Sequence, residues 1–125
     1  MHNVTANGAT IPAIGFGTFE LEPKDAEAMV EHALRVGYRH IDTAQAYKNE
    51  EAVGRGIKNS GVAREDIFLT TKVWTDRFTD GELQKSVAES LERLDTDYLD
   101  LLLLHWPNPD AVSYTHLTLP TIYSV

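Results

Sequence analysis

The strongest constraint on the fold is a regular alternation of strand-like and helix-like segments along the chain. Short runs of apolar and β-branched residues, predicted to be strands, occupy residues 13–18, 38–42, 67–73 and 98–104. Segments with helical periodicity follow the first three of these runs. Such alternation indicates parallel strands connected by helical crossovers. A chain of 125 residues is long enough for one core, so the sequence predicts a single domain of the α/β class.

Local signals predict where the first elements begin and end. Asn7-Gly8 separates two β-tolerant tripeptides, which is a strong hairpin signal because both turn residues must accept positive φ. Pro23 suits the first turn of a helix, and Gly37 suits its left-handed end. The apolar stripe predicted for this helix comprises Ala26, Met29, Val30, Ala33 and Leu34.

Capping signals mark the next two helices. Asn49 is a plausible N-cap for a helix that Gly61 ends. Gly54 and Gly56 lower the helix propensity of that segment, so either the helix packs tightly there or the prediction is weakened. A capping box over residues 79–82 is expected to open the third helix. The strand that follows it is almost wholly apolar, as expected of a parallel strand covered on both faces.

One polar or flexible residue stands at the C-terminal end of each predicted strand. These residues are Gly17, Asp42, Lys72 and His105. In a parallel sheet or barrel, all strand C-termini lie on one rim, where such folds keep their active sites. We therefore expect residues that are far apart in the sequence to converge at this rim, with Tyr47 close by.

The rim residues suit the reduction of a carbonyl group. A free phenol is a poor acid near neutral pH, with a pKa of about 10, but a neighbouring ammonium group stabilises the phenolate. Lys72 beside Tyr47 would therefore make a better proton donor, and Asp42 would hold Lys72 charged and oriented. His105 could donate a hydrogen bond to the substrate oxygen as negative charge develops there. The hydride must come from a cofactor, because no side chain supplies one.

Each of these residues also has an ordinary structural interpretation. Asp42 alone could be a cap or part of an ion pair, and Tyr47 could simply pack. Lys72 could be a solvated charge, and His105 could be a turn residue with its hydrogen bonds satisfied. The aromatic residues near the strand ends, which could line a substrate pocket or belong to the core, are Phe19, Trp74 and Trp106.

Composition and motifs argue against several other functions. The net charge of −8 disfavours binding to nucleic acid or an anionic membrane surface. The sequence has no cysteine, which fits a reducing cytoplasm, and no apolar run of the length that a bilayer needs. We expect a cytoplasmic protein that is not exported. We expect no metal site, because paired-histidine spacing is missing and a lysine would repel a cation. Glu20 occupies the third glycine position of a G-x-G-x-x-G phosphate loop.

The last residues differ in character from the rest. Residues 111–125 contain no Asp, Glu, Lys or Arg and show no helical stripe where a fourth crossover helix is due. We expect this tail to be a read-through or assembly artefact joined to a genuine N-terminal half, and the alternative is a real edge segment. The predicted organisation is one structural unit over residues 1–110 and a separate tail over residues 111–125.

Several motifs resemble the aldo-keto reductase family. The longest, G-Y-R-H-I-D-T-A-x-x-Y-x-N-E-x-x-V-G over residues 37–54, resembles the first signature of that family. Residues 17–19 (G-T-F), 71–74 (T-K-V-W) and 97–107 (D-Y-L-D-L-x-x-x-H-W-P) also match in family order and spacing. The resemblance covers about residues 8 to 110. Within the family, the chain looks most similar to the bacterial 2,5-diketo-D-gluconate reductases of the B type.

The resemblance implies a (β/α)8 TIM barrel, closed at its base by an N-terminal β-hairpin, of which this chain supplies about the first four β/α units. It implies NADPH bound across the strand C-termini and a small carbonyl compound as substrate. It assigns a catalytic tetrad, in which Tyr47 donates the proton, to Asp42, Tyr47, Lys72 and His105. It assigns cofactor contacts to Gly17, Thr18 and Asp42, and substrate contacts to Phe19, Trp74, His105 and Trp106.

Two functions follow from this resemblance. The first is NADPH-dependent reduction of aldehydes and ketones to alcohols, with 2,5-diketo-D-gluconate as one candidate substrate, by a longer and monomeric parent. The second is a non-catalytic subunit of the same fold that senses a nicotinamide cofactor, because such subunits can retain the tetrad. A barrel of this type needs about 250 residues, so we expect the chain of 125 residues to be inactive alone.

Overall fold

The computed structural model describes residues 2–108, and the tail predicted over 111–125 lies outside them. The described residues confirm the α/β prediction. Four strands pair in parallel in the order β3-β4-β5-β6, with a helix between each strand and the next. The strands are β3 (Phe16–Gly17), β4 (His40–Asp42), β5 (Phe68–Val73) and β6 (Leu101–Leu104), and the helices are α1 (Pro23–Arg35), α2 (Glu50–Ser60) and α3 (Glu82–Leu94).

The predicted hairpin precedes this sheet. Strands β1 (Asn3–Ala6) and β2 (Ala9–Pro12) pair in antiparallel fashion. The turn residues Asn7 and Gly8 have φ values of +48° and +82°, as the Asn-Gly signal predicts. The hairpin therefore forms for the reason that the sequence indicates.

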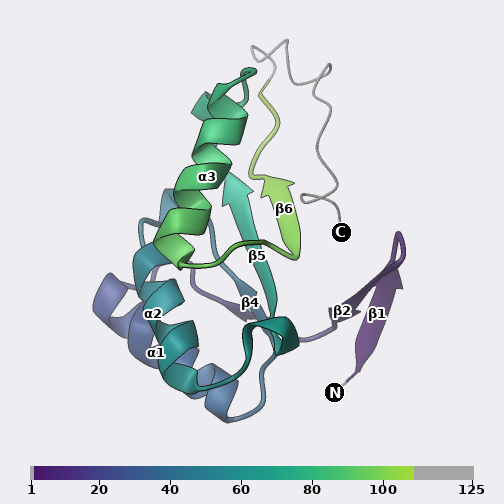
Figure 1. Cartoon of the computed structure of the whole chain (residues 1–125), viewed down its shortest axis with the longest axis vertical. Helices are drawn as coiled ribbons and strands as arrows, with labels where there is room; N and C mark the ends of the chain where they lie inside the picture. The colour runs from purple at the N-terminus through teal and green to yellow at the C-terminus, as the bar shows by residue number, and fades with distance from the viewer. Residues whose placement is uncertain (1, 109–125) are drawn as a thin grey trace.

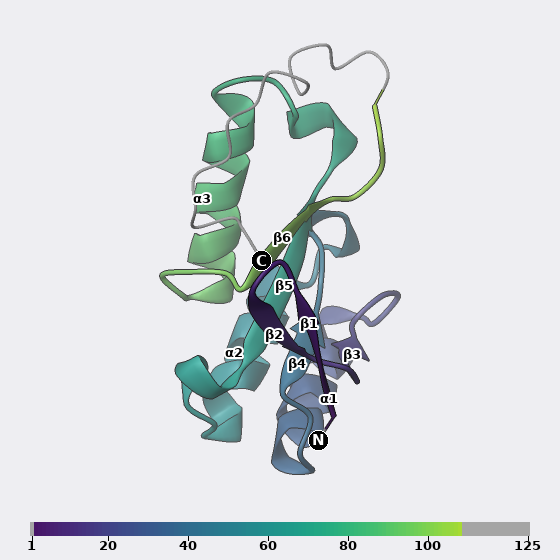
Figure 2. The same ribbon diagram turned by 90° about the vertical axis from the view of Figure 1, so that its right-hand side faces the viewer.

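The molecule is built as a layer of helices against one face of the parallel sheet. In Figure 1, α1, α2 and α3 lie together on the left, and the purple hairpin lies on the other side of the sheet. Figure 2, turned by 90°, shows the hairpin in front of the sheet. The arrowheads of β5 and β6 point to the same end of the molecule (Figure 1). Within residues 2–108, no helix is long and apolar enough to cross a membrane.

The apolar core lies between the sheet and the helix layer. Successive side chains of a strand point to opposite faces, so Leu69, Thr71 and Val73 of β5 are buried toward the helices. Helix α1 buries four of the five residues of its predicted stripe, and Met29, at the margin of that stripe, is 44% exposed. The largest contributors to the core include Leu34, Ile41, Leu69, Phe78 and Leu83.

Three predicted features differ from the structure. The last strand begins at Leu101 rather than at residue 98, because the Asp100 carboxylate accepts the Leu69 N–H at 2.9 Å. It is not covered on both faces, since Leu103 is 39% exposed. Helix α3 is capped at Gly81 rather than at Thr79, and the Gln84 side chain accepts the Gly81 N–H at 2.8 Å.

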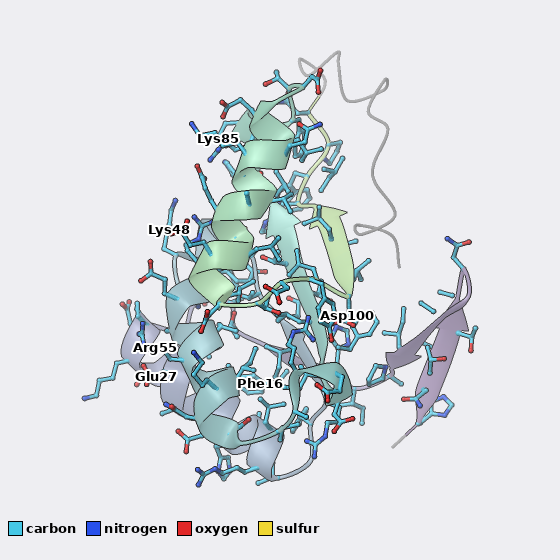
Figure 3. The ribbon with its side chains drawn as sticks, in the orientation of Figure 1. Phe16, Glu27, Lys48, Arg55, Lys85 and Asp100 are labelled. Atoms are coloured by element: carbon cyan, nitrogen blue, oxygen red, sulfur yellow. The ribbon has the colours of Figure 1, made fainter. Side chains whose placement is uncertain are left out.

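The glycines inside α2 permit close helix packing, as one of the two sequence interpretations requires. A Cβ at Gly54 would stand 2.7 Å from the Leu94 carbonyl oxygen, and one at Gly56 would stand 2.6 Å from the Glu27 carbonyl oxygen. Figure 3 shows Glu27 and Arg55 side by side between α1 and α2, where Arg55 Nε lies 2.7 Å from Glu27 Oε2. Both glycines therefore face another helix at backbone distance.

We predict that Gly56→Ala lowers the free energy of unfolding by about 1 to 3 kcal/mol through overpacking. Helix propensity alone would favour alanine by about 1 kcal/mol, but the new methyl group would meet backbone, which cannot move aside as a side chain can. Urea denaturation followed by circular dichroism measures the change. Gly17→Ala is the matched control, because a Cβ there meets nothing within 4 Å. Equal or greater stability of Gly56→Ala would contradict the prediction.

Candidate active site

Lys72 is the centre of a cluster of polar groups at the C-terminal edge of the sheet. Its ammonium nitrogen lies 2.6 Å from Asp42 Oδ1, 3.0 Å from the Thr43 carbonyl oxygen and 3.3 Å from Tyr47 Oη. An ammonium group has three N–H donors, so these three acceptors use all of them. The side chain is 14% exposed and that of Asp42 is 33% exposed, so water screens the ion pair only in part.

Strand register brings Asp42 and Lys72 together. In the parallel ladder, Gly17 is opposite Asp42, and Asp42 is opposite Thr70 on β5. Ile41 is buried toward the helices, so the alternation of side chains directs Asp42 to the other face of the sheet. Lys72 shares this face, because the buried Thr71 and Val73 on either side of it face the helices.

Tyr47 reaches the same cluster from a short turn after β4. The turn is the 3-10 helix η1 (Gln45–Tyr47), which Lys48 ends in the left-handed region at φ +58°. The Tyr47 ring lies 5.3 Å from the ring of Phe19 and 5.6 Å from that of His105, between centroids. The structure therefore brings Asp42, Tyr47, Lys72 and His105 together at one edge.

His105 is held between aromatic rings directly after β6. Its ring lies edge-to-face with Tyr47 and with Trp74, at 5.6 and 5.2 Å between centroids. Burial, together with the positive charge of Lys72, holds the pKa of His105 below its usual 6.5, and the Asp42 carboxylate opposes this effect. His105 is therefore neutral near pH 7.

Its Nδ1 atom is buried without a hydrogen-bond partner, the one such side-chain atom among the described residues. A neutral imidazole carries its proton on one nitrogen. Unpaired acceptors are tolerated in protein interiors more often than unpaired N–H groups. The environment therefore favours the tautomer with the proton on Nε2, which makes Nε2 a donor.

Three aromatic residues surround this cluster with exposed surface. Phe19 is 65% exposed, Trp74 is 38% exposed and Trp106 is 62% exposed. Within residues 2–108, these fractions are too high for core residues, and the assignment of these side chains to a substrate pocket stays a prediction. The ring planes of His105 and Trp106 are nearly parallel, with 6.4 Å between their centroids. The aromatic residues thus form an apolar border beside the polar cluster.

Comparison with known proteins identifies the family of this chain. The model of the aldo/keto reductase family matches residues 13–122. The chain belongs to the aldo/keto reductase family.

Individual relatives agree with this assignment. The methylglyoxal reductase DkgB of Salmonella typhi is 52% identical over 105 residues, which cover 83% of this chain and 39% of the relative. The glycerol 2-dehydrogenase (NADP(+)) of Saccharomyces cerevisiae is 52% identical over 100 residues, which cover 80% of this chain and 31% of the relative. The chain thus spans about two fifths or less of the length of these curated relatives.

A solved structure extends the agreement to three dimensions. This chain matches the crystal structure of a protein provisionally described as a 2,5-diketo-D-gluconic acid reductase B, with a TM-score of 0.86 and 52% identity. The matched region covers 89% of this chain and 40% of that protein. The hairpin and the strand-helix units of this aldo/keto reductase chain therefore match the N-terminal part of the family's barrel.

Asn49 has a different role from the predicted one. It occupies the N-cap position of α2, but its side chain caps no helical N–H. Its Nδ2 donates instead to the carbonyl oxygens of Thr18 (2.9 Å) and Leu21 (3.1 Å), and its Oδ1 accepts from the Thr43 hydroxyl (3.1 Å). Asn49 thus joins the start of α2 to the loop after β3.

The two neighbouring residues predicted to contact a cofactor differ in accessibility. Gly17 is exposed, and a Cβ built there would meet nothing within 4 Å. Thr18 is fully buried, and its hydroxyl donates to the Thr43 hydroxyl at 2.9 Å. The predicted cofactor contact of Thr18 stays a prediction, and the contact seen in this structure is with the protein itself.

Sequence reasoning missed two residues beside the cluster. Gln45 connects η1 to the residue after β5 and to α3. Glu50, only 2% exposed, accepts hydrogen bonds from Thr71 (2.7 Å) and Arg93 (2.8 Å). A glutamine after a strand carries no sequence signal for such contacts. Glu50 directly follows the predicted N-cap Asn49, and an acidic residue in a first helical turn is explained by the helix dipole alone, so the sequence does not indicate its burial.

We predict that Lys72→Met raises the pKa of His105. Burial, the largest cause of the lowered pKa, remains in this variant, but the substitution removes the positive charge that adds to it and keeps the opposing attraction of Asp42. Titration of the histidine ring protons by NMR measures the pKa. Lys85→Met is the control, because Lys85 is an exposed lysine of α3 (Figure 3). An unchanged or lower pKa in Lys72→Met would contradict the electrostatic account.

The lowered pKa of His105 also predicts a pH dependence of stability. Its folded-state pKa lies below its unfolded value of about 6.5. As the pH falls below that value, the unfolded chain takes up the proton first. The contribution of neutral His105 to the free energy of unfolding is therefore fully present above about pH 6.5. It is lost as the pH falls through the folded-state pKa. His105→Gln should reduce the loss of stability over this range, as measured by urea denaturation at several pH values.

Proposed function

We propose that a protein containing this chain reduces aldehyde and ketone carbonyls to alcohols with NADPH, and that Tyr47 donates the proton. The observation that carries the proposal is the position of Lys72 Nζ, 2.6 Å from Asp42 and 3.3 Å from the Tyr47 hydroxyl oxygen. The names of two relatives, methylglyoxal reductase and glycerol 2-dehydrogenase (NADP(+)), support a small carbonyl or alcohol as the reacting partner and NADP as the cofactor. A 2,5-diketo-D-gluconate is a further candidate substrate. By family resemblance, we expect the protein to be monomeric and cytoplasmic.

The hydrogen bonds of Lys72 free the proton of Tyr47 for transfer. Because the ammonium group is a donor only, it must donate to Tyr47 Oη. The phenolic proton then points to another acceptor, such as a substrate carbonyl oxygen. As that proton leaves, the adjacent ammonium stabilises the phenolate. Asp42 keeps the ammonium oriented throughout, since it holds the shortest of the three hydrogen bonds.

His105 would act beside Tyr47 as a neutral hydrogen-bond donor. Its lowered pKa keeps the ring uncharged, and the favoured tautomer places the proton on Nε2. A donor aimed at the carbonyl oxygen stabilises the negative charge that develops on this atom. Tyr47 and His105 would therefore bind the same oxygen, one to protonate it and the other to orient it.

The described residues fit the nicotinamide end of the cofactor. The open backbone of Gly17 lies in register with Asp42, so a planar group could approach the sheet edge there without a clash. NADPH, when bound, supplies the hydride that no side chain can provide. Gly17 and Asp42 would hold its reactive end next to Lys72, with Thr18 buried behind them. Phe19, Trp74 and Trp106 would exclude water from the reacting carbonyl.

A chimera tests the proposal. Residues 1–108 of this chain would replace the matching segment of the Salmonella typhi DkgB reductase, to which the chain is 52% identical. We expect the chimera to oxidise NADPH in the presence of methylglyoxal, and the chain of 125 residues alone to show no measurable turnover. Tyr47→Phe in the chimera should lower kcat about 10²- to 10⁴-fold, the usual worth of a positioned general acid.

Binding measurements separate catalysis from folding in this test. Tyr47→Phe should leave NADPH affinity, measured by quenching of protein fluorescence, close to that of the parent chimera. Tyr38→Phe is the matched control. The Tyr38 ring packs against Phe16 at the beginning of β3, away from Lys72, so this substitution should not change kcat. A folded chimera that binds NADPH but reduces no carbonyl would favour the non-catalytic sensor. Full activity of Tyr47→Phe would refute the role of Tyr47.

A further inference from the structure

Gln45 forms hydrogen bonds to two segments that are distant in the sequence. Its Oε1 accepts the backbone N–H of Trp74 at 3.1 Å. Its Nε2 lies 3.2 Å from the Ser86 carbonyl oxygen and 3.1 Å from Ser90 Oγ, both on α3. One amide side chain thus joins η1, the residue after β5 and a helix of the outer layer.

The chemistry of its partners determines the orientation of the Gln45 amide. The Trp74 N–H can only donate and the Ser86 carbonyl can only accept. If the amide were rotated by 180°, its NH2 group would face a donor and its oxygen would face an acceptor. Both contacts would then be lost, so a single orientation is compatible with these neighbours.

The helix side of this contact is itself anchored. Ser90 Oγ accepts from Gln45 Nε2 and from Arg93 Nη2 at 3.2 Å, and it donates to Glu50 Oε1 at 3.4 Å. A hydroxyl group offers one donor and two acceptor sites, so these three contacts satisfy Ser90 fully. Gln45 is therefore held against a partner whose donor and acceptor sites are all in use.

The geometry points to Gln45 as a positioning residue, which fixes the turn that carries Tyr47 and the backbone of Trp74 relative to His105. This role rests on the proposed function, since it is a role in carbonyl reduction. Gln45 begins η1 and Tyr47 ends it, so a displacement of Gln45 moves the phenol. The Trp74 ring packs edge-to-face against His105 at 5.2 Å. Gln45 thus acts on both sides of the proposed carbonyl site without touching the substrate.

The test uses the full chain of 125 residues without cofactor or substrate. Gln45→Met keeps the length of the side chain and removes both hydrogen-bonding groups. NMR would measure the hydrogen exchange of the Trp74 amide and the titration of the His105 ring. We expect the Trp74 amide to exchange about tenfold faster, as loss of the hydrogen bond that Gln45 accepts from this N–H allows. We expect the pKa of His105 to rise toward its usual value, because burial is the largest cause of its lowering.

A second variant separates the two hydrogen-bonding functions of the Gln45 side chain, which accepts from Trp74 and donates to α3. Gln45→Glu keeps an oxygen that can accept the Trp74 N–H but cannot donate to the Ser86 carbonyl. The Trp74 amide should then exchange within about threefold of the wild-type rate. The pKa of His105, compared at high salt so that the added carboxylate is screened, should still rise as the turn separates from α3. This variant also keeps the proposal testable if Gln45→Met fails to fold.

Gln84→Met is the matched control. Gln84 also accepts a backbone N–H, that of Gly81 at 2.8 Å, at the start of α3. Its substitution should leave Trp74 exchange and His105 titration unchanged. The positioning role would be overturned if folded Gln45→Met kept the wild-type exchange rate of the Trp74 amide and the wild-type pKa of His105. It would also be overturned if Gln84→Met changed these two quantities as much as Gln45→Met does. Neither measurement involves turnover, so failure here is distinct from failure of the proposed reductase activity, which the chimera tests.

Discussion

The site depends on the three hydrogen bonds of the Lys72 ammonium group. A charged group with little exposure must be paired, because its desolvation is costly. Lys72 meets this requirement with a carboxylate, a backbone carbonyl and a phenol, from Asp42, Thr43 and Tyr47. The need to pair one partly buried cation is therefore met by β4, β5 and η1 together. The same arrangement leaves the phenolic proton available for transfer.

The parallel sheet separates stability from chemistry by its two faces. On β5, Leu69 and Val73 are buried against the helices, while Lys72 lies on the opposite face. Substitutions that change the core therefore need not change the charge distribution of the site. Thr71 is the polar exception on the helix side, and its hydroxyl donates to the buried Glu50 carboxylate. This bond connects the strand that carries Lys72 to the beginning of α2.

Sequence periodicity and strand spacing were enough to predict the hairpin, the order of strands and helices, and the convergence of Asp42, Tyr47, Lys72 and His105. These features follow from local propensity and from the rule that parallel strands end on one rim. The roles of Gln45 and Asn49 could not be predicted in this way. Gln45 contacts Ser90 and Asn49 contacts Thr18, pairs separated by 45 and 31 positions, so their partners depend on how helices and loops pack.

The position of Tyr47 depends on side-chain contacts at both ends of its turn as well as on the hydrogen bonds of the turn itself. A single 3-10 turn has poor hydrogen-bond geometry, and the backbone bonds of η1 run from Tyr47 N to Ala44 O at 3.1 Å and from Lys48 N to Gln45 O at 3.3 Å. Gln45 ties the beginning of this turn to α3. Immediately after the turn, Asn49 ties the chain to the loop after β3, while Glu50 ties it to β5 and α3. Because these contacts lie on opposite sides of the turn, the phenol can be held in place by residues that do not touch the substrate.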